Sequence, residues 1–225
     1  MTEQELSDFV ISQPYPLTDE DKALIHKASP GTPIKEHWYN SCLSALKQRL
    51  REYYTDVQND KCAYCRMDIS RATGLPHIEH IAPKSLYPQW MYKPVNLCLA
   101  CPRCNSFKGA KDVLINKNAE ILPVDSSSYT IVHPHLDRYF DHIHIIDDLL
   151  YQGVTEKGIN TIQLCHLMRT GLLEERAKIK IRQEQCPDSY TKLLMIYYSN
   201  PDLIENWDEL IMSVEKLIHR YQGDS

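Results

Sequence analysis

The chain has 225 residues, a net charge of -5 and eight cysteines. This length can bury a substantial core without disulfide staples, and the sequence holds no apolar run long enough for a membrane-spanning helix. Since the N-terminus is acidic where a secretory signal would be basic and then apolar, we expect a soluble, cytoplasmic protein with no membrane partner, whose cysteines are thiols or metal ligands.

The first predicted elements are helices. Thr18 and Asp21 form a capping-box pattern that predicts a helix running through Ala28, and the sequence Ser-Pro-Gly that follows would end it. Apolar residues recur at helical spacing from about His37 to Thr55, which predicts an amphipathic helix leading into the next segment.

The central segment predicts two strands and a helix. Residues 77–81 and 95–99 read as short strands joined by a loop. Asn105 is a good N-cap and predicts a helix from Ser106 to about Asn116. Strand, loop, strand, helix is the order of a ββα unit.

The C-terminal half predicts a hairpin and further helices. Residues 143–151 favour a hairpin turning at Asp147 and Asp148. Residues 159–185 predict a helix bent near Gly171, and two more helices are expected over 189–199 and 201–222. We therefore expect an α+β protein, mainly α-helical, in which a small central module is flanked by N- and C-terminal helices.

Two Cys-x-x-Cys pairs bracket the first predicted strand. Cys62 and Cys65 precede it, and Cys101 and Cys104 follow the second strand, so the four thiolates are candidates to hold one structural zinc ion. The alternative is that they are small buried side chains in a core. Cys98 forms a rival pair with Cys101, but it falls on the predicted second strand, where we expect it to pack in the core.

The charge is unevenly spread along three expected regions. These are an N-terminal helical region (1–60), a zinc module (61–120) and a C-terminal region of hairpin plus helices (121–225). Residues 61–118 carry nine basic and three acidic side chains, a net charge of +6 that leaves -11 for the flanks. A polyanion should be drawn to the central module and repelled by its surroundings. The alternative is that these charges only keep the module soluble.

Glu79 and His80 are the candidates for chemistry. Phosphodiester hydrolysis requires an activated water and a cation that neutralises charge on the phosphate. A histidine with one ring nitrogen held by a carbonyl offers the other as a base, so His80 is the candidate general base. Glu79 and the side-chain oxygen of Asn105 suit Mg²⁺ or another divalent cation. Adjacent strand residues point to opposite faces, so we expect distortion at the strand end.

Other polar residues have more than one interpretation. His77 is expected to line the site or to hydrogen-bond the loop. A histidine group further along invites a second metal, but its spacing fits a loop and a strand, so we expect structural roles for His133, His135, His142 and His144. The candidates for phosphate contact are Lys84, Lys93, Arg103 and Lys108. Lys108 could equally extend its stem across the helix start.

Four elements in this order resemble the HNH endonuclease family with the ββα-metal fold. They are Cys62-x-x-Cys65, Glu79-His80-Ile-x-Pro83, Asn96-Leu97 and Cys101-x-x-Cys104-Asn105-x-x-Lys108, and they cover about 60 residues. The resemblance implies that His80 is the catalytic base and that Asn96 holds the loop carrying it. Asn105 would be a catalytic-metal ligand where the family often has histidine. Glu79 stands where aspartate is common, and it lengthens that ligand by one methylene.

A longer pattern resembles the HNH subunits of Septu and retron-associated antiphage systems, which operate beside an ABC-type or SMC-like ATPase. It comprises Ile121-Leu-Pro, His133-Pro-His-Leu-Asp137, and Lys157-Gly-Ile-Asn-Thr161-Ile-Gln-Leu leading into Leu172-Leu-Glu-Glu-Arg176. The resemblance implies an effector endonuclease with an ATPase partner, since this sequence has no Walker motif. We expect DNA rather than RNA as substrate. Two alternatives stay open: an RNA-cleaving HNH ribonuclease, and a zinc-stapled module that binds nucleic acid without cutting it.

Overall fold

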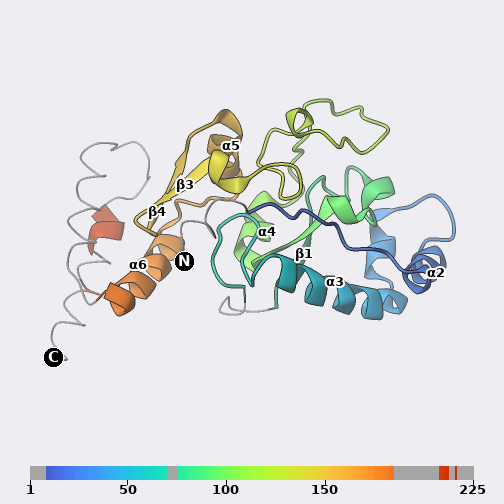
Figure 1. The fold of residues 1–225 in the computed structure, drawn as a ribbon. Helices are drawn as coiled ribbons and strands as arrows, with labels where there is room; N and C mark the ends of the chain where they lie inside the picture. The colour runs from blue at the N-terminus through green and yellow to red at the C-terminus, as the bar shows by residue number, and fades with distance from the viewer. Residues whose placement is uncertain (1–8, 70–74, 185–207, 213–215, 217–225) are drawn as a thin grey trace.

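The computed structural model describes residues 9–69, 75–184, 208–212 and 216 (Figure 1). Its helices are α2 (Asp19–Ala28), α3 (Ser44–Val57), α4 (Pro102–Lys108), α5 (Glu156–Leu164) and α6 (Thr170–Glu184), and its strands are β1 (His77–His80), β2 (Leu97–Ala100), β3 (Ile143–Ile146) and β4 (Leu150–Gly153). These elements make an α+β protein with two small sheets, β1–β2 and β3–β4, as expected. The predicted helices over 189–199 and 201–222 lie outside the described residues, except for 208–212 and 216, which are helical.

The N-terminal helices follow the sequence signals in part. The capping box of Thr18 and Asp21 begins α2, and this prediction is confirmed. The single helix predicted from His37 is wrong at its start, because two 3₁₀ turns (Lys35–Tyr39 and Ser41–Leu43) precede α3. The break lies at Asn40, whose backbone is extended and whose side chain accepts a hydrogen bond from the amide of Cys42 at 3.1 Å.

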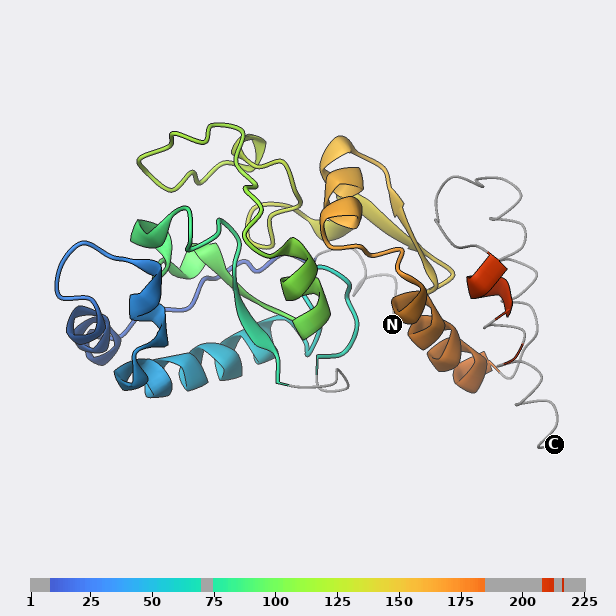
Figure 2. The same ribbon diagram turned by 180° about the vertical axis from the view of Figure 1, so that it is seen from behind.

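The strand–strand–helix order is present in the centre of the chain. Strands β1 and β2 pair antiparallel, and α3 and α4 both pack against them (Figures 1 and 2). The helix predicted to begin after Asn105 begins earlier, at Pro102, with Cys101 as its N-cap. It ends at Lys108 because Gly109 turns the backbone to φ +54°, a conformation that glycine adopts at little cost.

The C-terminal half contains the predicted hairpin. Ile146 pairs with Leu150, so three residues form the loop, and its first two, Asp147 and Asp148, both adopt positive φ (52° and 56°). The single bent helix predicted over 159–185 is instead two helices, α5 and α6. They separate before Gly171, in a segment where His166 has φ +48°. Within the described residues, no helix is both long and apolar enough to cross a bilayer.

Candidate metal centre and active site

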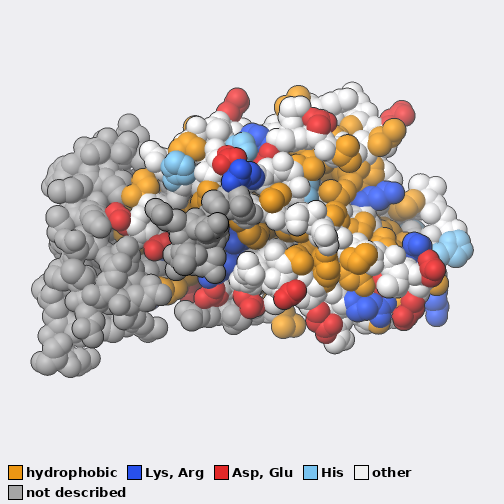
Figure 3. All heavy atoms as spheres, in the orientation of Figure 1, with side chains coloured by type: hydrophobic (Ala, Val, Ile, Leu, Met, Phe, Trp, Pro, Cys, Tyr) orange, Lys and Arg blue, Asp and Glu red, His pale blue; other side chains and the backbone are white. Residues whose placement is uncertain are grey.

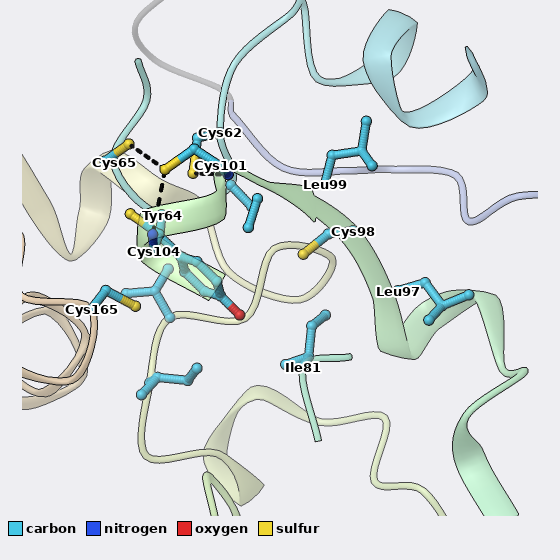
Figure 4. Close-up of a cluster of buried hydrophobic side chains, with 14 of the residues drawn as sticks. Cys62, Tyr64, Cys65, Ile81, Leu97, Cys98, Leu99, Cys101, Cys104 and Cys165 are labelled. Atoms are coloured by element: carbon cyan, nitrogen blue, oxygen red, sulfur yellow. Dashed lines mark hydrogen bonds between the residues drawn. The ribbon is translucent and has the colours of Figure 1, made fainter. Parts of the chain in front are cut away.

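Four cysteines form one buried cluster. The Sγ atoms of Cys62, Cys65, Cys101 and Cys104 all lie within 4.8 Å of one another (Figure 4). The amide of Cys101 donates to Cys62 Sγ at 3.3 Å and that of Cys104 donates to Cys101 Sγ at 3.4 Å, which favours thiolates. Hydrogen bonds from the neighbouring thiols, that of Cys104 first, lower the pKa of Cys101. Four convergent thiols in a closed, buried site fit a structural zinc ion.

The remaining cysteines of this region stay out of the cluster. Cys98 is fully buried on β2, and its sulfur lies apart from the four clustered sulfurs, as does that of Cys165 (Figure 4). The rival pairing of Cys98 with Cys101 is therefore not formed. Among the described residues, the four-cysteine cluster is the sole group of three or more potential His, Cys, Asp or Glu ligands close enough to share a metal ion.

Side chains from the C-terminal half hold the first Cys-x-x-Cys turn. The hydroxyl of Tyr139 donates to the carbonyl of Tyr64 at 2.7 Å. The Arg176 guanidinium donates to the carbonyl of Cys65 at 2.7 Å and to the Tyr151 hydroxyl at 2.7 Å. These contacts were not predicted from the sequence. The one hint of them was Arg176, the last residue of the motif that begins at Leu172. The four-cysteine cluster is thus supported by contacts from the C-terminal half of the chain.

Glu79 and Lys108 form a buried ion pair between β1 and α4. Lys108 Nζ lies 2.6 Å from Glu79 Oε1 and donates to the carbonyl of His80 at 3.0 Å. The Tyr64 hydroxyl donates to the same Glu79 oxygen at 3.4 Å. Lys108 is 0% exposed, so its predicted contact with phosphate is wrong: the ammonium is enclosed and neutralises a carboxylate. Burial raises the pKa of Glu79, and the charge of Lys108 opposes that shift.

Replacing Lys108 with methionine should leave the buried Glu79 carboxylate without its charge partner. Removing one partner of a buried ion pair costs about 3–5 kcal/mol, so we expect the free energy of unfolding to fall by that amount. Urea denaturation measures it, with the exposed Lys111→Met as the matched control. The double variant Glu79→Gln, Lys108→Met should recover part of the loss. Equal stability of Lys108→Met and wild type would contradict the ion pair.

His80 lies at the end of β1 with one ring nitrogen fixed. Its Nε2 lies 3.2 Å from the carbonyl of Met91, and since a carbonyl only accepts, Nε2 carries the hydrogen and Nδ1 is left as the acceptor. The ring packs edge-on against Trp38, with centroids 4.5 Å apart. Burial lowers the pKa of His80 well below its ordinary value, and the nearby charges of Lys84 and Lys108 lower it further. The imidazole is therefore neutral at pH 7.

The distortion expected at the strand end is absent. His80 pairs in regular register with Leu97, and Glu79 pairs with Cys98. Glu79 accordingly faces α4, whereas His80 faces Trp38, because the hydrogen bonds of β1 keep the strand regular through its last residue. The structure thus places the two candidate catalytic side chains on opposite faces of one strand.

Asn96 holds the loop that follows His80. Its Oδ1 accepts from the amide of Ala82 at 2.7 Å, and its Nδ2 donates to the carbonyls of Ala82 (3.1 Å) and Trp90 (3.3 Å). The side chain is fully buried. Its contacts are those that a loop-positioning residue would make.

Truncating Asn96 to alanine should therefore loosen this loop. Each buried group left unpaired costs about 1–3 kcal/mol, so we expect a loss of at least that size in the free energy of unfolding. Thermal and urea denaturation measure the loss, and the exposed Asn118→Ala is the control. An Asn96→Ala protein as stable as the control would show that these bonds do not matter.

Asn105 and His77 meet on the α4 side of β1. Asn105 Nδ2 lies 2.8 Å from His77 Nδ1, His77 is exposed and Asn105 is half-buried. His77, expected to line the site or bond the loop, thus contacts the helix. With Glu79 facing the same helix, this side offers an imidazole, an amide and a carboxylate, a donor set that fits a divalent ion. Lys108 and Tyr64 engage Oε1 of Glu79, which leaves Oε2 for such an ion.

Unlike Lys108, the other three candidates for phosphate contact are at least partly exposed. Lys93 and Arg103 are exposed, and Lys84 is half-buried with Nζ 5.5 Å from the centre of the Tyr39 ring. In the view of Figure 3, basic and acidic side chains mix along the edge formed by α2 and α3. That view therefore presents no uniform basic surface over these two helices.

The histidine group near the C-terminal half has structural contacts. His133 and His135 are buried, His142 bonds Thr155 at 2.7 Å, and His144 is exposed. Beside them, Asp137 pairs with Lys157, which joins two of the motifs that lie far apart in the sequence. The second-metal interpretation has no support among the described residues, whose one metal-like group is the cysteine cluster.

These buried histidines predict acid sensitivity. Burial lowers the pKa of His133 from 6.5 to about 3, so between these values the unfolded chain binds a proton that the folded chain does not, and stability falls as pH falls. The expected slope is about 1.4 kcal/mol per pH unit for one such histidine. Urea titrations at pH 5.0 and 6.0 measure it: His133→Phe should lessen the slope, and the exposed His144→Phe should not. Equal slopes in all three proteins would contradict this.

The fold and site define an α+β protein built around a buried four-cysteine cluster that could hold a metal ion. Over 154 residues the chain is 30% identical to the Septu protein PtuB of Bacillus thuringiensis, a stretch that covers 64% of this chain and 54% of PtuB. It is therefore PtuB-like over that stretch. Over 111 residues it is 27% identical to protein ea31 of Escherichia phage lambda, covering 48% of this chain and 33% of ea31.

The chain thus spans about half the length of PtuB and about a third of ea31. No family profile matches the sequence. No solved structure matches the fold.

Proposed function

We propose that this protein is a metal-dependent HNH endonuclease that hydrolyses phosphodiester bonds of nucleic acid, with DNA as its substrate class. The observation that carries the proposal is the state of His80: a neutral imidazole whose Nε2–H is held by the Met91 carbonyl and whose Nδ1 is an acceptor. A base for water must lack its proton at working pH and must be fixed in one orientation. His80 meets both requirements at the end of a strand in a strand–strand–helix unit.

Each neighbouring residue has a role in this proposal. His80 Nδ1 takes a proton from the attacking water, and Asn96 fixes the loop behind it. His77, Glu79 and Asn105 would hold the divalent ion, which when bound supplies positive charge to the phosphate. Since Glu79 and His80 face opposite sides of β1, the scissile phosphate must lie at the edge of the strand that β2 does not cover, where both faces can be reached. The four thiolates leave no open position, so their zinc is structural.

The biological setting is also proposed. Septu is part of the printed name of the relative, and the motif order resembles HNH subunits of antiphage systems. We place the protein as the effector subunit of an antiphage complex whose ABC-type or SMC-like partner binds ATP. Residues 61–120 would be its zinc module, and the regions on either side would contact the partner.

The test compares binding and cleavage on the same labelled molecules. Wild-type protein, alone and with its candidate ATPase and ATP, is incubated with duplex DNA and with RNA of the same sequence in Mg²⁺ or Mn²⁺. Cleavage of DNA supports the proposal. Cleavage of RNA alone would instead favour a ribonuclease, and binding without cleavage of either would favour the non-catalytic module.

A further inference from the structure

A group of basic side chains lies near His80, and none of them is paired with a carboxylate in the part of the chain that the structure describes. Lys47 and Arg51, on α3, and Lys84, in the loop after β1, are half-buried, and within the described residues none of the three forms an ion pair with a carboxylate. Arg49, on the same helix, pairs with the buried Asp21. Among the described residues, Arg49 is thus neutralised, whereas Lys47 and Arg51 are not.

The three cations lie close to one another. Arg51 Nη1 donates to the backbone carbonyl of Lys47 at 3.4 Å, and its Nε is buried without a hydrogen-bond partner among the described residues. Burial lowers the pKa of Lys47, and the positive charges of Arg51 and Lys84 lower it further. Three like charges held together at a partly buried surface repel one another, and a bound anion would relieve that repulsion.

The group is also next to the candidate base. Lys47 Nζ lies 5.0 Å from the centre of the Trp38 ring, and that ring packs against the imidazole of His80. Lys84 Nζ lies 5.5 Å from the ring of Tyr39, which is 71% exposed. Aromatic rings interleaved with cations are typical of surfaces that bind nucleic acid. The indole of Trp38 therefore lies between Lys47 and His80, the proposed catalytic base.

We propose that Lys47, Arg51 and Lys84 form a surface that binds DNA backbone phosphates adjacent to the bond at His80. This inference rests on the proposed nuclease function for the location of the scissile bond, and it assigns substrate binding to α3, which lies outside the central basic segment. Phosphate contacts require reach and charge and carry no base code, so the surface positions DNA without selecting sequence.

The test is the salt dependence of DNA binding. The variants are made in a His80→Ala background, which keeps the DNA uncut; they are Lys47→Gln, Arg51→Gln and Lys84→Gln, singly and together. Binding of a labelled duplex is followed by fluorescence anisotropy between about 50 and 200 mM salt. The triple variant should lower the slope of log affinity against log salt by about 2–3 and weaken binding on the order of 10- to 100-fold. The control variant replaces three exposed lysines outside residues 61–118 with glutamine. It removes the same charge elsewhere and should change binding little; the three are Lys22, Lys27 and Lys216.

The outcomes separate this inference from the proposed function. Zinc content and melting temperature are measured for every variant to confirm that it is folded. Lys84→Gln does not alter α3, so it tests phosphate binding independently of changes to that helix. Suppose that wild type cleaves DNA, but that the triple variant of Lys47, Arg51 and Lys84 has the same affinity and the same salt dependence as the control variant. The inferred phosphate-binding surface is then overturned, and the proposed nuclease function is not. Suppose instead that this triple variant loses affinity and salt dependence, but that wild type does not cleave DNA. The phosphate-binding surface is then supported, and the hydrolytic function is contradicted.

Discussion

Replacing Cys104 with serine is expected to release the metal and unfold the strand–strand–helix unit. The four cysteines join the turn after α3 to the start of α4, two segments that are held across β1 and β2. Structural zinc in small modules supplies folding free energy on the order of 10 kcal/mol, which exceeds the net stability of many whole domains. No single side-chain replacement outside these four cysteines should cost as much.

The measurement is zinc content by elemental analysis together with thermal unfolding followed by circular dichroism. Wild type should carry one zinc per chain, and Cys104→Ser should lose it and its cooperative transition. Cys42→Ser is the matched control, because Cys42 is half-buried outside the cluster. Metal-free wild type that is well folded, or Cys104→Ser that melts like the control, would refute the zinc assignment.

Replacing His80 with alanine is expected to reduce cleavage by about 10²–10⁴-fold while DNA binding is retained. The loss follows because His80 is neutral, oriented by Met91 and placed at the end of β1, where hydrolysis is proposed. Its neighbours Trp38 and Met91 would remain, so the surface that meets DNA changes little.

The readout is the single-turnover cleavage rate of a labelled duplex, measured beside its dissociation constant. Because alanine leaves space against Trp38, His80→Gln is made as a second variant, and zinc content confirms that both are folded. His144→Ala removes an exposed histidine and serves as control. A zinc-loaded His80→Ala protein that cuts at the wild-type rate would exclude His80 as the base.

The features that the sequence predicted well depend on residues close together in the chain. The capping box of Thr18, the turn at Asp147 and Asp148, and the two Cys-x-x-Cys pairs each have local rules that fix their geometry. The order of strands and helix in the centre follows from the same kind of rule.

The features that were missed depend on contacts between distant residues. Lys108 was a candidate for phosphate contact or for a stem lying across the helix start, but it is buried in an ion pair with Glu79, 29 positions earlier. Charge counted along the chain assigned α3 to an acidic flank that repels DNA. The fold instead places Lys47 over Trp38, whose ring packs against His80, and Arg51 beside Lys47, while Arg49 is neutralised by Asp21. The contact of Arg176 with Cys65 likewise has no local signal.

In the proposed nuclease, a zinc-stapled strand–strand–helix unit carries a hydrolytic site that needs a second, divalent cation. The most direct measurement is the time course of supercoiled plasmid cleavage by zinc-loaded wild type with its ATPase partner, in EDTA, Mg²⁺ or Mn²⁺. We expect cleavage in Mg²⁺ or Mn²⁺ and none in EDTA at unchanged zinc content, since four thiolates offer substrate no open position. Equal cleavage in EDTA, or none in any condition by folded protein, would contradict it.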